Sequence, residues 1–124
     1  MKLFGEFIDL APTIRAGISS DGRLLIGRGR YGLVIDTGFN GDMSAPRGIL
    51  HSLDLVYSGT MPFQLADGSV KWKHLWQGWI VLGEHEYETI FIEGDFLLGM
   101  ELSRDLFKHF ILDFDLKHVE LRVR

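Results

Sequence analysis

The chain has 124 residues, no cysteine and a formal net charge of −4 at neutral pH. A chain of this length builds one hydrophobic core, so we expect a single domain spanning residues 1–124. The missing cysteines exclude disulfides and thiolate chemistry, and the acidic balance argues against nucleic acid as the main partner.

The N-terminal segment carries Glu6, Asp9 and Pro12, which interrupt its apolar residues, so we predict no signal peptide. No apolar run in the sequence approaches the ~18 residues that a membrane span needs. Together with the absence of cysteine, these features lead us to expect a soluble, cytoplasmic protein.

Short runs of apolar and β-branched residues, separated by turn signals, recur along the whole chain. In chain order, strands are predicted at residues 12–18, 23–26, 31–36, 61–65, from 70 onward, 79–82, 87–92, 111–114 and 119–123. Glycine-containing turns are predicted at residues 19–22, 66–69 and 83–86. A short helix is predicted from Arg47 to Leu53, and another from Met100 to Phe110, where apolar residues recur at helical spacing. This succession predicts an all-β barrel or sandwich with a helix near its C-terminus.

Residues 27–41, GRGRYGLVIDTGFNG, begin with the G-x-G-x-x-G spacing of a dinucleotide-binding loop. Such a loop needs a helix that starts at its last glycine. Here Gly32 is followed by Leu-Val-Ile and, six residues on, by another glycine, a pattern that favours a strand over a helix. We interpret the glycine-arginine half as a hairpin connection and not as a phosphate site.

The second half of the same stretch, LVIDTG at residues 33–38, places a carboxylate at the end of a buried strand. Burying a charge is costly unless the group is paired or shares a proton. Thr37 can form a local hydrogen bond, and Gly38 lets the backbone turn tightly beside Asp36. The tripeptide by itself is compatible with a structural aspartate that caps a turn and with a catalytic aspartate.

The sequence lacks the patterns of several other kinds of enzyme. Ser58-Gly59-Thr60 does not have the G-x-S-x-G spacing of a serine hydrolase. The five histidines show neither H-x-H nor H-E-x-x-H spacing, so we predict no metal site and no cofactor.

Three segments of the chain carry a resemblance to a known family. They are residues 33–38, Phe63-Gln64-Leu65-Ala66-Asp67-Gly68-Ser69, and Phe96-Leu97-Leu98-Gly99-Met100-Glu101-Leu102. In this order they resemble the segments of the retroviral-type (retropepsin-like) aspartic proteases, in particular of their small single-lobe cellular relatives. The resemblance runs from about Thr13 to Val123. It implies a mainly β fold, a closed barrel of short antiparallel strands with a flap hairpin and one short C-terminal helix.

The resemblance also implies roles for single residues. Asp36 would be catalytic, and Thr37 and Gly38 would support the active-site loop. Ala66, Asp67, Gly68 and Ser69 would form the flap that covers the substrate, and Leu97, Leu98 and Gly99 the apolar element that packs across the aspartate strand. The chain departs from the family at Phe39, where a small residue is commoner, and in the flap tip, which lacks the glycine run of the retroviral enzymes.

Hydrolysis of this type uses two carboxylates that share one proton across a bound water, and such close groups titrate in separate steps. The sequence holds one Asp-[Thr/Ser]-Gly, because Asp21-Gly22 and Asp67-Gly68 lack the middle hydroxyl residue. We therefore expect a C2 homodimer in which Asp36 meets the partner's Asp36 and which cleaves an extended peptide or protein substrate. The alternative is a catalytically silent dimerisation or peptide-binding module with the same fold, which holds an extended peptide by strand addition.

Overall fold

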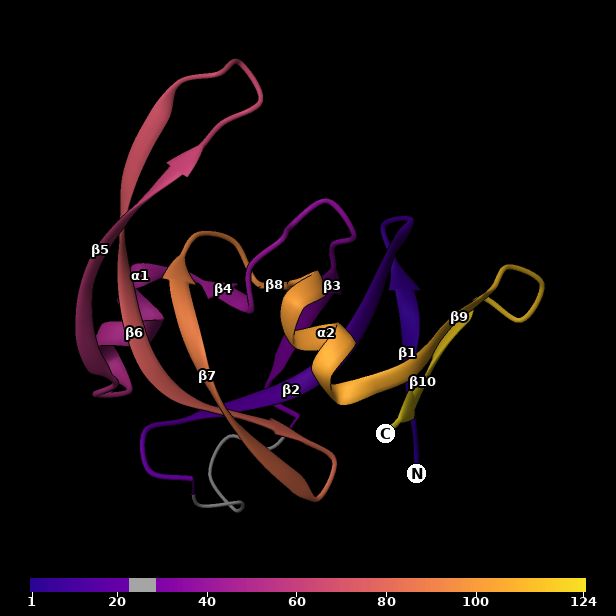
Figure 1. Ribbon diagram of the computed structural model, residues 1–124. Coiled ribbons are helices and arrows are strands. Elements are labelled where there is room, and N and C mark those ends of the chain that lie inside the picture. The colour runs from indigo at the N-terminus through magenta and orange to yellow at the C-terminus, as the bar shows by residue number, and fades with distance from the viewer. Residues whose placement is uncertain (23–28) are drawn as a thin grey trace.

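The computed structural model describes residues 1–22 and 29–124, which form a mainly β structure (Figure 1). The described strands are β1 (Lys2–Ile8), β2 (Ala11–Ser19), β3 (Tyr31–Ile35), β4 (Met43–Ala45), β5 (Val56–Gln64), β6 (Val70–Leu82), β7 (His85–Glu93), β8 (Leu97–Leu98), β9 (Phe107–Asp113) and β10 (His118–Val123). Two short helices accompany them, α1 (Arg47–Ser52) and α2 (Met100–Leu106). In this described part of the chain, no helix has the length and apolar character that crossing a bilayer demands.

Six of the described strands close into a ring. Hydrogen bonds connect them in the order β6-β7-β4-β8-β3-β2, and β2 pairs back onto β6, with Ile18 opposite Ile80. Most neighbours are antiparallel, but β3–β8 and β4–β7 are parallel pairs. The expectation of antiparallel strands throughout is therefore wrong, because the chain reaches these neighbours by long crossovers and not by tight hairpins.

The hydrophobic core is built mainly from the strands of this ring, with contributions from α1, α2, β9 and β10. Successive side chains of a strand point to opposite faces, and the positions that face inward here are apolar. The largest fully buried side chains are Phe91, Ile18, Leu33, Met43, Leu50, Ile80, Leu82, Leu98, Leu121, Val81 and Val119. Strand β3 contributes Leu33 and Ile35 to this core, so the strand that precedes Asp36 is anchored along its inner face.

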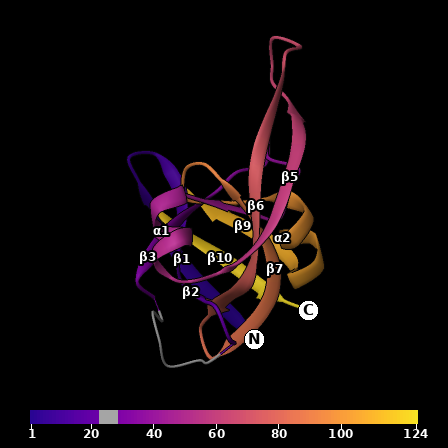
Figure 2. The same cartoon turned by 90° about the vertical axis from the view of Figure 1, so that its left-hand side faces the viewer.

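Two extensions leave the ring at opposite ends of the strand order. Strands β5 and β6 continue as a long hairpin that projects from the body (Figures 1 and 2). At the other end, β1, β10 and β9 extend the sheet beyond β2 as antiparallel neighbours. The two chain ends meet in this second extension, where the Val123 N–H donates to the Met1 carbonyl at 2.9 Å.

The predicted turns at residues 66–69 and 83–86 are confirmed as hairpins, as is the short helix that starts at Arg47. The helix predicted within residues 100–110 is too long, because α2 ends at Leu106 and Phe107 is already extended, with φ −121° and ψ 143°. Pairing with β10 overrides the helical spacing, since Phe110 lies opposite the buried Leu121. Strands β9 and β10 follow the helix, as the predicted strands at residues 111–114 and 119–123 require.

Some predictions fall on residues that are not described. The strand predicted at residues 23–26 and the start of the G-x-G-x-x-G stretch lie outside the described residues. Strands β1, β4 and β8 were not predicted as strands from the sequence, although Leu97 and Leu98 of β8 belong to the apolar-glycine element.

Candidate active site

Strand β3 carries Asp36 to one end of the ring. Leu33 is fully buried and Ile35 is 4% exposed, so the strand cannot slip without moving two core side chains. Strand β2 flanks it on one side, with Thr13 opposite Val34, and β8 runs parallel to it on the other. Because β3 is paired along both edges, its carboxyl end is a rigid place from which to present a side chain.

The apolar-glycine element lies directly beside the aspartate. Leu97 pairs with Val34 and Leu98 with Ile35, and the Asp36 N–H donates to the Leu98 carbonyl at 3.0 Å. Asp36 is therefore the last residue that β8 holds before the chain turns. The expected contact between this element and the aspartate strand is present in the structure.

The Asp36 turn is closed by its own carboxylate. The Gly38 N–H donates to Asp36 Oδ1 at 2.9 Å, and the Phe39 N–H donates to the Asp36 carbonyl at 3.2 Å. Asp36 is half-buried, whereas Thr37 and Gly38 are exposed. One carboxylate oxygen thus orients the side chain, and the turn itself stands at the surface of the described chain.

The loop after this turn, residues 39–42, is bonded to the start of α2. Three backbone N–H groups donate to its carbonyls: Gly99 to Asp42 at 2.8 Å, Met100 to Phe39 at 2.8 Å, and Glu101 to Gly41 at 3.3 Å. Gly99 is required at this junction, because a Cβ atom there would lie 1.9 Å from the Gly41 carbonyl oxygen. The first N–H groups of α2, which have no partner within the helix, are thereby satisfied by the loop that follows the Asp36 turn.

Two side-chain hydrogen bonds extend this support beyond the backbone. Ser44 is 4% exposed and donates its hydroxyl to the Asp95 carbonyl at 2.6 Å. Thr89 donates to Asp42 Oδ2 at 3.2 Å. Neither pair was identified from the sequence, because the partners are about fifty positions apart and no local pattern connects them.

Phe39 packs back onto its own loop. The side chain is half-buried, and a Cβ atom at Gly41 would lie 2.6 Å from the Phe39 ring. The large residue at this position is thus accommodated by a glycine two residues later. The sequence shows the glycine, but it does not show that the Phe39 ring packs where a Cβ atom of residue 41 would lie.

The four residues expected to cover the substrate form the tip of the β5–β6 hairpin. Ala66, Asp67, Gly68 and Ser69 are all exposed, and Gly68 has a positive φ of 86°. The Ser69 hydroxyl and backbone N–H both donate to Asp67 Oδ1, at 2.6 and 2.8 Å, and these bonds lower the pKa of Asp67. The structure brings residues 97–99 to Asp36 but leaves this tip projecting away from the body (Figure 2).

Two tryptophans of β6, Trp72 and Trp76, differ in exposure. Trp76 is 6% exposed and belongs to the core, whereas Trp72, on the same face of the strand, is 64% exposed. Tyr57 and His74 continue this face, with their Oη and Nδ1 atoms 2.6 Å apart. The base of the hairpin is therefore packed into the body, and its outer part presents an aromatic surface.

No group of three or more His, Asp or Glu side chains that could hold a metal ion occurs within residues 1–22 and 29–124. Comparison of the chain with models of protein families, with curated proteins and with solved structures finds no match. What the chain does is therefore inferred from the geometry around Asp36.

Proposed function

We propose that this chain is one half of an aspartic endopeptidase of the retroviral type, and that two copies form the active enzyme. The observation that carries the proposal is the setting of Asp36. Its backbone is held by β8 through the Asp36 N–H, its carboxylate is oriented by the Gly38 N–H, and its turn is exposed. A carboxylate held this firmly at a surface is suited to meeting a second one.

The second carboxylate would come from a second copy. The chain contains one Asp-Thr-Gly, and a two-fold axis beside the exposed turn would bring Asp36 and the partner's Asp36 together. Thr37 would then be placed to bond across the axis. Two close carboxylates do not both ionise readily, so the pair would hold one proton between them.

The chemistry follows from that shared proton. The ionised carboxylate takes a proton from a bound water, and the oxygen of that water attacks the peptide carbonyl carbon. The protonated carboxyl donates its hydrogen to the carbonyl oxygen, which gives a tetrahedral diol. Collapse of the diol transfers a proton to the leaving nitrogen, so the carbon–nitrogen bond breaks and an acid and an amine are released.

The projecting β5–β6 hairpin favours an extended peptide as the substrate. An extended peptide can form main-chain hydrogen bonds to a hairpin and place alternate side chains on either side of itself. The tip residues Ala66 to Ser69 would cover such a peptide when the hairpin bends toward the Asp36 turn. The exposed Trp72 and Tyr57 lie on the hairpin and would favour apolar side chains.

The test is hydrolysis of an unfolded protein substrate over the acidic to neutral pH range. We expect a bell-shaped pH dependence, inhibition by a statine-type transition-state mimic, and a loss of ~10²–10⁴-fold or more for Asp36→Asn. Asn is nearly isosteric, so the variant should fold and self-associate as wild type does. Asp54→Asn is the matched control, because Asp54 is exposed with a φ of 63° that Asn tolerates well.

An Asp36→Asn variant that cleaves as fast as wild type would refute the proposal. Absence of hydrolysis in the wild type, combined with binding of extended peptides by a dimer, would favour the silent peptide-binding module instead.

A further inference from the structure

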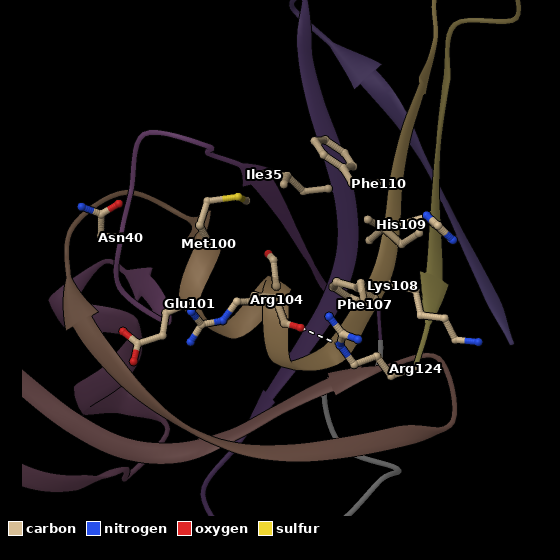
Figure 3. A pocket seen from close by; sticks show the side chains of 12 residues that line it. Ile35, Asn40, Met100, Glu101, Arg104, Phe107, Lys108, His109, Phe110 and Arg124 are labelled. Carbon is tan, nitrogen blue, oxygen red and sulfur yellow. Dashed lines mark hydrogen bonds between the residues drawn. The ribbon is translucent and has the colours of Figure 1, made fainter.

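Two pockets of the described chain are lined in part by basic side chains. The larger, of about 610 Å³, lies between α2 and β9 (Figure 3). Arg124 Nε donates to the Arg104 carbonyl at 2.7 Å, and Arg104 Nε lies 3.9 Å from Asp105 Oδ1. The wall of this pocket includes the apolar side chains of Met100 and Phe107. Two basic groups of the larger pocket therefore have partners within the chain.

The smaller pocket, of about 280 Å³, lies where the β5–β6 hairpin leaves the body. It is lined by Arg47, Lys71, Lys73, Glu93 and Gly94. Both lysines belong to the part of β6 that precedes its pairing with β7. The lining thus has three cations and one carboxylate, in a chain whose formal net charge is −4. Like charges gathered in one place repel each other, so this arrangement costs free energy unless an anion offsets it.

The cations of the smaller pocket are unpaired in the described part of the chain. Among residues 1–22 and 29–124, no ion pair or hydrogen bond involves the side chain of Arg47, Lys71 or Lys73. By contrast, Lys2 pairs with Glu120 at 3.2 Å. The three cations are therefore available to an anion from outside the chain.

The carboxylate of the pocket holds the hairpin to the body. Glu93 Oε1 accepts the His74 backbone N–H at 3.2 Å. Glu93 is the last residue of β7, and four residues later the chain enters β8, which holds the Asp36 backbone. In Figure 1 the hairpin, the loop after β7 and the loop after β3 all lie on the upper side of the molecule. The pocket therefore connects the hairpin with the segment that supports the candidate catalytic residue.

An acidic side chain of a bound peptide fits this pocket better than a free anion does. Exposed ion pairs are individually weak, because water solvates both charges well, and a free anion would have to offset its loss of freedom with such contacts alone. A peptide that the hairpin already holds brings its side chain to the pocket at high effective concentration. Lys71 and Lys73 lie on one face of β6, ~6.6 Å apart along the strand, so one carboxylate can lie between their ammonium groups.

We propose that Arg47, Lys71 and Lys73 form a subsite that selects peptides with an Asp or Glu side chain at a fixed distance from the cleaved bond. This inference rests on the proposed function, because it names the class of peptide that the hairpin holds. Glu93 reduces the excess of positive charge in the pocket, so its neutralisation should strengthen the selection.

The test begins with cleavage of a peptide mixture, in which mass spectrometry identifies the residues around each cleaved bond. Peptide pairs that differ only by Glu or Gln at the enriched position are then compared. The assays are run at about pH 6, where carboxylates are ionised, and at low salt. We expect the Glu peptide to have a kcat/KM about 3- to 10-fold higher than the Gln peptide. This preference should disappear at about 1 M NaCl, which screens exposed charges.

Substitutions in the pocket should change the preference in opposite directions. Lys71→Gln and Lys73→Gln should each reduce it, and Lys73→Glu should favour a Lys peptide over the Glu peptide. Glu93→Gln should increase it, since the Gln oxygen still accepts the His74 N–H. Lys117→Gln is the matched control, because it removes the same charge from the exposed turn between β9 and β10, at the other end of the strand order, and should leave the preference unchanged.

The outcomes separate this inference from the proposed function. Hydrolysis without a preference for acidic peptides, or with one that Lys71→Gln and Lys73→Gln together leave unchanged, overturns the subsite and leaves the protease standing. If the wild type cleaves nothing but binds Glu peptides more tightly than Gln peptides, and the double variant does not, the subsite is supported and the protease is overturned.

A third arm uses inorganic phosphate alone. Phosphate at millimolar concentration that shifts the NMR signals of Lys73 and Gly94, combined with equal cleavage of the Glu and Gln peptides, identifies a site for free anions and overturns the peptide subsite. Neither hydrolysis nor binding of any peptide overturns both proposals.

Discussion

Two aspartates of this chain sit in turns of nearly the same local chemistry, and their surroundings differ completely. Asp36 accepts the N–H of Gly38, two residues on, and Asp67 accepts the N–H of Ser69, also two residues on. Asp67 is fully exposed at the tip of a hairpin that projects from the body. Asp36 is half-buried, follows a strand paired along both edges, and is backed by β8.

Support from distant segments of the chain distinguishes Asp36 from Asp67. An aspartate followed by a turn is common chemistry in loops, and the bonds around Asp67 are all local. Around Asp36 the local turn is joined by contacts from residues 95–101, which lie about sixty positions away in the sequence. Preorganisation of a catalytic group depends on such surrounding support. Substitutions in the segments that support Asp36 should therefore have larger effects than a substitution in the Asp67 turn.

The largest effect is expected from Gly99→Ala. Its Cβ atom would meet the Gly41 carbonyl oxygen at 1.9 Å and the Asp42 carbonyl oxygen at 3.1 Å, and backbone atoms cannot move aside cheaply. We expect a loss of about 3 kcal/mol in the free energy of unfolding, measured by urea denaturation, with loss of any hydrolytic activity. Gly48→Ala is the control, because no atom lies within 4 Å of its added Cβ. Equal stability of both variants would show that the junction tolerates a side chain.

An intermediate effect is expected from Ser44→Ala. The variant leaves the Asp95 carbonyl without the 2.6 Å hydrogen bond that ties β4 to the segment before β8. Ser44 is buried but Asp95 is exposed, so water can replace the lost bond at the Asp95 carbonyl, and we expect a loss of about 1 kcal/mol, again measured by urea denaturation. Ser52→Ala removes an exposed hydroxyl that donates to Ile49 at 3.0 Å, and should change stability by about 0.5 kcal/mol or less. If the two variants lose equal stability, the Ser44 hydrogen bond stabilises the fold no more than an exposed one does.

The smallest effect is expected from Ser69→Ala, in the other turn. The Ser69 hydroxyl is the largest cause of the lowered pKa of Asp67, so its removal should raise that pKa toward the ordinary value. Because the pKa is lowered in the folded state, these bonds stabilise the tip above the pKa of the unfolded chain and are lost as the pH falls through the folded-state pKa. The measurement is an NMR titration of the Asp67 carboxyl. An unchanged pKa would contradict the assigned cause.

The sequence was sufficient where a local pattern determined the structure. The run at residues 33–38 predicted a strand that ends in a presented carboxylate, and β3 does so. The turn at residues 66–69 was predicted from Asp67-Gly68, whose glycine has the positive φ that a tight turn needs. These features depend on neighbours within a few positions, so propensity and spacing can identify them.

The sequence was insufficient where the partner was distant. Strand β1 has apolar residues on both faces, with Phe4 63% exposed and Leu3 turned inward, so its alternation cannot be recognised. Strand β8 has two residues and exists because of its pairing with β3 and β4. The apolar spacing after Met100 fitted a helix as far as Phe110, and only the register with β10 decided that Phe107 begins a strand.

By itself, then, the sequence determined a mainly β chain with a carboxylate at the end of a buried strand, because alternation and turn chemistry are local properties. Only the tertiary structure decided that residues 97–101 hold the backbone around this carboxylate in place, and that β5 and β9 end the sheet of described strands. These outcomes depend on which distant segments pair, and pairing is selected by burial of the whole core rather than by any one segment.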